Sequence, residues 1–167
     1  DMVTFGLLPG ITMYKALEPF GYQLFNITLP FEISYFGLFI ALFSCLRLAI
    51  FNLDDEQKYY FKGLNTPSNT ILIFGLYFAY QEKAAFEFLL SNQVYLILLV
   101  VLSSWLLISP IKMIAFKFKS MKLQDNYPKL ALLIGAIVLL ILFKIVAIPL
   151  IIIYYILISI IFQKQLK

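Results

Sequence analysis

Three features of this chain have residue types that could perform chemistry, and each lies beside an apolar run. Asp1 opens one run, Arg47 lies five residues before Asn52 near the end of another, and residues 62–69 (KGLNTPSN) form a polar segment. A carboxylate can act as a general base or bind a hard metal ion. A guanidinium can bind a carboxylate or a phosphate through two parallel hydrogen bonds. These residue types suit a site for an anionic substrate.

Simpler interpretations of both charged residues stay open at the level of sequence. A carboxylate at the start of a helix is favoured by the helix dipole. An arginine near a membrane interface can keep its guanidinium in water while its stem lies in lipid. We favour a functional site because Asp1, Arg47, Asn52 and the 62–69 segment fall at one membrane face in the topology described next.

The composition is that of an integral membrane protein. Of the 167 residues, 62% are hydrophobic and 13% are charged, against usual shares of about 45–50% and about 25%. One cysteine, Cys45, and no histidine leave no means for an intrachain disulfide or a zinc, haem or thiolate-cluster site built within this chain. The net charge of +4 comes from scattered lysines, so we expect no nucleic-acid partner.

Apolar runs of about 20 residues predict an all-α, polytopic membrane protein with about six transmembrane helices in a single membrane domain, residues 1–167. The expected spans are 1–17, 31–52, 69–88, 93–111, 130–146 and 149–163. The last run, 130–163, is longer than one helix needs. Lys144 and Pro149 favour two short spans that turn near 145–149 over one helix with a proline kink.

The distribution of lysine predicts the orientation. If the loops over 53–68 and 112–129 share a side with the C-terminus, that side holds nine lysines and the other side holds three. The positive-inside rule then places Asp1, Arg47 and the polar loop at the cytoplasmic face of the cell inner membrane. The nine are Lys58, Lys62, Lys112, Lys117, Lys119, Lys122, Lys129, Lys164 and Lys167, and the three are Lys15, Lys83 and Lys144.

Three segments resemble the CDP-alcohol phosphatidyltransferase family, specifically its bacterial phosphatidylserine synthases. The opening DMVTFGLLPG is similar to the family's D-x-V-[ST]-x-G-x-x-P, residues 47–52 (RLAIFN) to RLARFN, and residues 63–69 (GLNTPSN) to GLPTPAN. Asn65 and Ile50 depart from the family's usual proline and arginine. The tail 128–163 resembles the paired C-terminal helices of the longer synthases.

Asp1 matches the last aspartate of the family motif DG-x2-AR-x8-G-x3-D-x3-D, whose other members are not in this chain. The chain also starts at Asp1-Met2-Val3, without an initiator methionine or a signal segment. We therefore expect an N-terminally truncated fragment, which would be inactive when expressed alone because one aspartate cannot hold the metal that a diphosphate requires.

The resemblance implies a CDP-diacylglycerol–serine O-phosphatidyltransferase of phospholipid biosynthesis. The family transfers a phosphatidyl group from CDP-diacylglycerol to the hydroxyl of L-serine, which yields phosphatidylserine and CMP, with Mg²⁺ or Mn²⁺ as cofactor, and its members are commonly homodimers. Asp1 would be the general base and a metal ligand. Arg47, the chain's only arginine, is our candidate to bind the serine carboxylate. The expected substrate-binding residues are Arg47, Asn52, Lys62, Gly63, Thr66, Pro67 and Asn69.

Two alternatives remain. The chain could belong to a family member with another acceptor alcohol, although the RLAxFN and GLxTPxN segments argue against this. It could instead be a small transporter or a structural membrane protein in which Asp1 and Arg47 are incidental.

Overall fold

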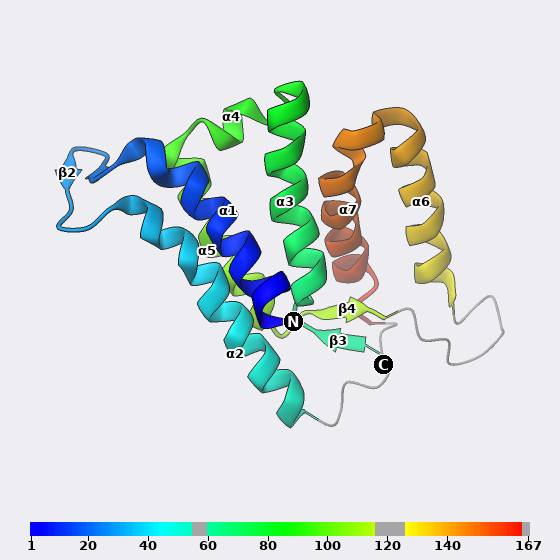
Figure 1. Cartoon of the computed structure of the whole chain (residues 1–167). Helices are drawn as coiled ribbons and strands as arrows, with labels where there is room; N and C mark the ends of the chain where they lie inside the picture. The colour runs from blue at the N-terminus through cyan, green and yellow to red at the C-terminus, as the bar shows by residue number, and fades with distance from the viewer. Residues whose placement is uncertain (55–59, 116–125, 165–167) are drawn as a thin grey trace.

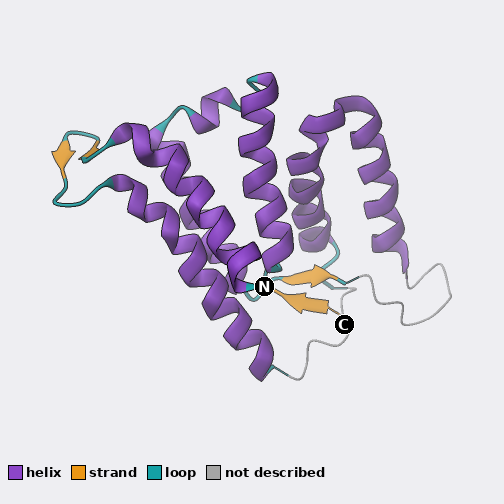
Figure 2. Cartoon of the chain, in the orientation of Figure 1, coloured by secondary structure: helices purple, strands orange, loops and turns teal. Residues whose placement is uncertain are grey.

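The computed structural model describes residues 1–54, 60–115 and 126–164, and these residues are mostly helical (Figures 1 and 2). The longer helices run up and down a layered bundle, and α4 (Glu87–Leu90) is a single turn. The longer helices are α1 (Leu8–Leu17), α2 (Phe39–Leu53), α3 (Thr66–Lys83), α5 (Gln93–Ile108), α6 (Tyr127–Phe143) and α7 (Ala147–Ile161). The predicted helical class is therefore confirmed in its main part.

Shorter elements extend or join these helices. A π-helical segment over Val3–Leu7 precedes α1, a 3₁₀ turn over Glu18–Phe20 follows it, and a 3₁₀ segment over Ile33–Leu38 leads into α2. Two antiparallel strand pairs were not predicted: β1 (Gln23–Leu24) with β2 (Ile27–Thr28), and β3 (Tyr60–Lys62) with β4 (Lys112–Ile114).

Helix α3 lies at the centre of the bundle and joins its two parts. It contacts α1, α2 and α5 on one side and α7 on the other, while α6 packs on α7 at the outer edge (Figure 1). Apolar side chains of α1, α3 and α5, among them Met13, Ile73, Leu76 and Leu96, form the larger core and are almost fully buried. A smaller core joins the α6–α7 pair to β4.

A glycine lets α1 approach the segment before α2 very closely. A Cβ atom at Gly37 would collide with the backbone of Met13 and Tyr14 on α1. Small residues commonly allow such backbone contact between membrane helices. This contact fixes α1 beside α2, so the start of the chain lies next to the last turns of α2.

The final apolar run forms a helical hairpin. A 3₁₀ turn over Lys144–Val146 separates α6 from α7, and Lys144 has a positive φ of 50°. The prediction of two short helices is confirmed, with the turn slightly earlier than expected. Pro149 lies in the first turn of α7, where its missing N–H has no carbonyl partner to lose, so it does not kink the helix.

Two segments are long and apolar enough to cross a membrane, Ile33–Leu53 and the α6–α7 run Tyr127–Ile161. This finding is compatible with a membrane protein, but the prediction of six crossings is not confirmed. The other helices are shorter or more polar. Helix α5 has 16 residues and is therefore about 24 Å long, less than the roughly 30 Å of a hydrocarbon core.

Helix α3 begins and ends earlier than the predicted 69–88. The side chain of Asn65 accepts a hydrogen bond from the Ser68 amide at 2.8 Å, so Asn65 caps the helix, and Pro67 lies in its first turn. Ala84, in the left-handed conformation, ends it at the other side. The N-terminus of α3 therefore lies inside the polar segment that the sequence marked as a candidate site.

Candidate functional site

The strands β3 and β4 bring two distant loops together at the end of the bundle where the chain begins (Figure 1). Tyr60 pairs with Ile114 and Lys62 with Lys112. The described parts of the two loops that carry most lysines thus lie side by side. Five of the nine lysines counted above lie outside the described residues: Lys58, Lys117, Lys119, Lys122 and Lys167.

Side chains of α7 and of the turn that follows it bind the outer edge of β4. The Tyr155 hydroxyl donates to the Ile114 carbonyl at 2.8 Å, and the Ile114 amide donates to Ser159 Oγ at 3.2 Å. The Gln163 amide group donates to the Lys112 carbonyl at 2.6 Å and accepts from the Lys112 amide at 3.2 Å. Tyr155 and Ser159 are four residues apart on one face of α7, and Gln163 lies in the turn that follows the helix. They occupy the edge that a third strand would otherwise fill.

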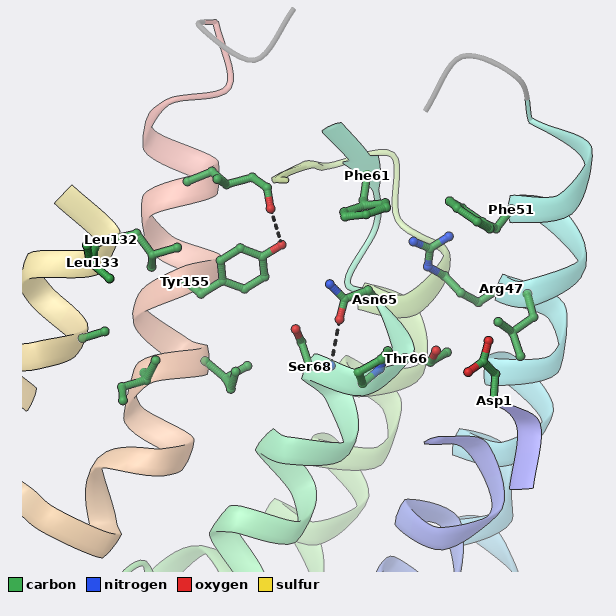
Figure 3. A pocket seen from close by; sticks show the side chains of 16 residues that line it. Asp1, Arg47, Phe51, Phe61, Asn65, Thr66, Ser68, Leu132, Leu133 and Tyr155 are labelled. Carbon is green, nitrogen blue, oxygen red and sulfur yellow. Dashed lines mark hydrogen bonds between the residues drawn. The ribbon is translucent and has the colours of Figure 1, made fainter. Parts of the chain in front are cut away.

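A cavity of about 530 Å³ lies between α2, the start of α3, the two strands and the α6–α7 pair. In Figure 3, Arg47 and Asp1 enter it from one side and Tyr155 from the opposite side, with Asn65 and Ser68 between them. Its volume is within the range of small-molecule sites, roughly 300–1,000 Å³. Of the predicted site residues, Asp1, Arg47, Thr66 and Pro67 line this cavity.

Arg47 is a buried cation at the cavity wall. Its side chain is only 4% exposed, its Nε donates to the Leu64 carbonyl at 3.1 Å, and its guanidinium lies 5.6 Å from the centre of the Phe51 ring. In the described part of the chain, no carboxylate forms an ion pair with it. A buried charge without a counterion is costly. The Nη donors on the cavity side would therefore be stabilised by an anionic ligand.

The N-terminus of α3 supplies a second positive feature. Helix N-termini carry partial positive charge and favour bound anions. Asn65, Thr66 and Ser68, all in this first turn or capping it, line the cavity. Arg47 and the α3 N-terminus therefore favour negative charge in the same space.

Asp1 places a carboxylate at the same cavity. Its backbone carbonyl accepts from the Phe5 amide at 2.8 Å, which continues the helical segment, while its exposed side chain has no hydrogen bond to the described residues. Such a carboxylate can accept a proton from a hydroxyl group.

The described residues do not by themselves form a metal centre. Asp1 is the one carboxylate among the described residues that line the cavity, and no group of three Asp, Glu, His or Cys side chains is found in the described part of the chain. The Mg²⁺ or Mn²⁺ that the family resemblance implies therefore remains an expectation, and no reaction step is assigned to it.

Asn52 and Lys62 do not line the cavity. Asn52 is exposed, and it follows Arg47 by five residues on α2, which turns its side chain by about 140° from Arg47. Lys62 forms an ion pair with Asp54, with its Nζ 2.9 Å from the carboxylate. The prediction that Arg47 and Asn52 act together in one site therefore does not agree with the helix geometry.

Gly63 and Asn69 lie outside the cavity and stabilise its surroundings. Gly63 has φ +76°, and a Cβ there would lie 2.6 Å from the Leu107 carbonyl oxygen, so the turn fits tightly against the end of α5. This turn presents the Leu64 carbonyl that holds Arg47. Asn69 is fully buried and accepts from Ser103 Oγ at 2.6 Å, which ties α3 to α5.

Sequence reasoning missed Tyr155 as a cavity residue. The signal that could have found it is the spacing Tyr155, Ser159, Gln163, which repeats a polar side chain every four residues, the spacing of one helix face, near the end of a largely apolar segment.

Comparison of the chain with models of known protein families and with curated proteins found no match. The family resemblance therefore rests on the three sequence segments. Each of the three contributes residues to the cavity: Asp1 from the first, Arg47, Leu48 and Phe51 from the second, and Asn65–Ser68 from the third.

Proposed function

We propose that this chain forms part of a CDP-diacylglycerol–serine O-phosphatidyltransferase that acts at the cytoplasmic face of the cell inner membrane. The observation that carries the proposal is the cavity in which Asp1, Arg47 and the N-terminus of α3 meet. These groups come from three segments far apart in the sequence, and each of those segments resembles the same family.

The cavity has a cationic side and an otherwise largely apolar lining, which suits an amphipathic substrate. Arg47 and the α3 N-terminus form the cationic side, while α6 and α7 contribute aliphatic side chains opposite. CDP-diacylglycerol joins an anionic diphosphate to two acyl chains. The diphosphate near the N-terminus of α3, the serine carboxylate at Arg47 and the acyl chains near α6 and α7 would satisfy both sides.

The proposed reaction is a displacement at phosphorus. The serine hydroxyl oxygen forms a bond to the phosphorus that carries diacylglycerol, and the bond from that phosphorus to the bridging oxygen of CMP breaks, so CMP leaves with the electron pair. The Asp1 carboxylate takes the hydroxyl proton. The Nη groups of Arg47 bind the serine carboxylate and orient the hydroxyl for attack.

The lysines support the proposed orientation. Lys62 and Lys112 on the paired strands, and Lys129 at the start of α6, lie at the cavity end of the bundle, whereas Lys83 and Lys144 lie at the opposite end. Such an asymmetry is typical of the cytoplasmic side. The homodimeric state implied by the resemblance stays a prediction.

The first test uses Arg47→Ala and Arg47→Lys in the natural protein that contains this chain, assayed in membranes by serine-dependent release of CMP. Loss of one charge-assisted contact of about 1.5–3 kcal/mol predicts a decrease in kcat/KM for serine of roughly 10- to 150-fold. Arg47→Lys should be almost as damaging because an ammonium cannot form the bidentate contact. Lys15→Ala, at the far end of the bundle, is the matched control and should leave the rate unchanged.

The outcomes separate the alternatives. If Arg47→Ala raises the KM of CDP-diacylglycerol and spares that of serine, Arg47 binds a phosphate and our acceptor assignment is wrong. If glycerol phosphate or another alcohol replaces serine, the acceptor is wrong but the transfer reaction stands. If no alcohol releases CMP from CDP-diacylglycerol, the protein is not this enzyme.

A second test concerns the general base. Asp1→Asn in the same natural protein keeps the size of the side chain but cannot accept a proton, so turnover should be abolished while the amount of folded protein in the membrane is unchanged. A near-normal rate for this variant would remove Asp1 from the catalytic residues.

A further inference from the structure

The aliphatic wall that faces Arg47 across the cavity comes from one pair of helices, α6 and α7. Leu132, Leu133 and Ala136 on α6, and Ile151 and Ile152 on α7, line the side opposite Arg47. Figure 3 shows Leu132 and Leu133 across the cavity from Arg47 and Asp1. The two halves of the site therefore belong to different parts of the chain.

This wall continues into the outer surface of the bundle. In the described chain, Pro128 and Leu132 are the buried residues of α6, and most of its other side chains are exposed and apolar. Leu133 lines the cavity and is still 53% exposed. A hydrocarbon chain that starts in the cavity can thus extend along α6 to the lipid without crossing a polar surface.

The position of α6 against α7 is fixed by close contacts. Gly135 packs directly against the Tyr154 ring, which leaves no space for a Cβ atom, and the Tyr154 hydroxyl donates to the Ala131 carbonyl at 2.8 Å. Ala136 follows Gly135 and has the smallest side chain of the apolar wall. Because α6 cannot easily move away from α7 here, the size of residue 136 sets the space available on this side of the cavity.

We propose that the α6–α7 pair binds an acyl chain of a diacyl phospholipid substrate, and that Ala136 is a specificity-determining residue for the length of that chain. The inference rests on the proposed function of the same cavity. It assigns to the α6–α7 pair the selection of the lipid, separately from the residues that bind the anionic group.

The expected effect of a substitution at residue 136 can be judged from how strongly hydrophobic pockets distinguish ligands of different length. One extra or missing methylene group in such a pocket changes recognition by about 10- to 200-fold. Ala136→Phe adds an aromatic ring to the wall, so we expect binding of a long acyl chain to fall at least about ten-fold relative to a short one. Arg47→Ala should instead leave the chain-length preference for phosphatidic acid unchanged, because the proposed partner of Arg47 is the serine carboxylate and not the lipid.

The experiment measures binding of phosphatidic acid to the purified natural protein in detergent by native mass spectrometry. The lipid carries either six-carbon or eighteen-carbon acyl chains. Phosphatidic acid shares the diacylglycerol phosphate with CDP-diacylglycerol but cannot release CMP, so the readout does not depend on catalysis. Val138→Phe is the matched control, because Val138 lies on α6, is 47% exposed and does not line the cavity. It should leave the chain-length preference unchanged.

An equal effect of Ala136→Phe and Val138→Phe, or an equal loss of both lipids in Ala136→Phe, would overturn the inference. If Ala136→Phe does not fold, two other variants test the inference. Ala136→Leu narrows the cavity less severely and Leu133→Ala widens it, so they must shift the chain-length preference in opposite directions. If the preference shifts as expected but serine-dependent release of CMP is absent, the lipid subsite stands and the proposed function fails.

Discussion

The contact between α7 and β4 gives the sharpest test of the structure, and the perturbation is Tyr155→Phe. The Tyr155 hydroxyl donates to the carbonyl of Ile114, and both residues are buried. Phenylalanine keeps the ring in the cavity wall and removes only the hydroxyl. The Ile114 carbonyl is then left without the partner that satisfies it.

The magnitude follows from the cost of a buried polar group without a hydrogen bond. Such a group costs about 1–3 kcal/mol, whereas hydrogen bonds between membrane helices average about 0.6 kcal/mol with a maximum near 1.7 kcal/mol. Because Ile114 is only 1% exposed, water cannot easily replace the hydroxyl, and we expect about 1–2 kcal/mol. For a protein of this size, 1 kcal/mol corresponds to roughly 2–4 °C in Tm.

The assay is thermal unfolding in detergent micelles, in which Tyr155→Phe should lower Tm by about 2–8 °C. Tyr154→Phe is the matched variant, because its hydroxyl also donates to a carbonyl, that of Ala131, but lies between α6 and α7 rather than at β4. Gln163→Ala removes the hydrogen bond to Lys112 at the other end of the same edge of β4. Its effect on the free energy of unfolding should be non-additive with that of Tyr155→Phe and additive with that of Tyr154→Phe. A change within about 0.5 kcal/mol for Tyr155→Phe, typical of a surface substitution, would refute this reasoning.

Two further predictions concern the turn before α3 and the topology. Gly63→Ala should lower the free energy of unfolding by about 1–3 kcal/mol or more through its positive φ and its clash with α5, whereas Gly21→Ala, with a positive φ of 59° but open space, should lose less in the same unfolding assay. With Cys45 replaced by serine, a cysteine at Lys62 should be shielded from an impermeant thiol reagent in intact cells and one at Lys83 labelled. The opposite labelling pattern would invert the proposed orientation.

The helices were predictable because their signal is local. Runs of apolar residues place α5, α6 and α7 to within a few residues, and they place α2 as closely only when the 3₁₀ segment before it is included. Lys144 and Pro149 marked the turn between α6 and α7. Helix α3 shows the limit of that signal. Its boundaries depend on the Asn65 cap and on the left-handed Ala84, and neither changes the hydropathy that was used to place the span.

The short strands could not be predicted, since their stability is not local. β3 and β4 have three residues each and pair across about fifty positions. An isolated two-stranded pair is marginal in water. Here the outer edge of β4 is satisfied by side chains of α7 and of the turn after it, so the strand exists only where tertiary packing brings that helix to it.

The candidate site was likewise predictable only in part, because its segments can be recognised locally but the directions of their side chains depend on the tertiary structure. Sequence motifs identified the segments that meet, but neighbours in a motif need not be neighbours in a site. Arg47 faces the cavity while Asn52, in the same motif, does not, because five residues of helix separate their directions. Gly63 does not line the cavity, but it shapes the turn whose Leu64 carbonyl accepts a hydrogen bond from Arg47. The aliphatic wall opposite the arginine comes from α6 and α7, far along the chain, and only the packing of α7 against α3 and β4 places it there.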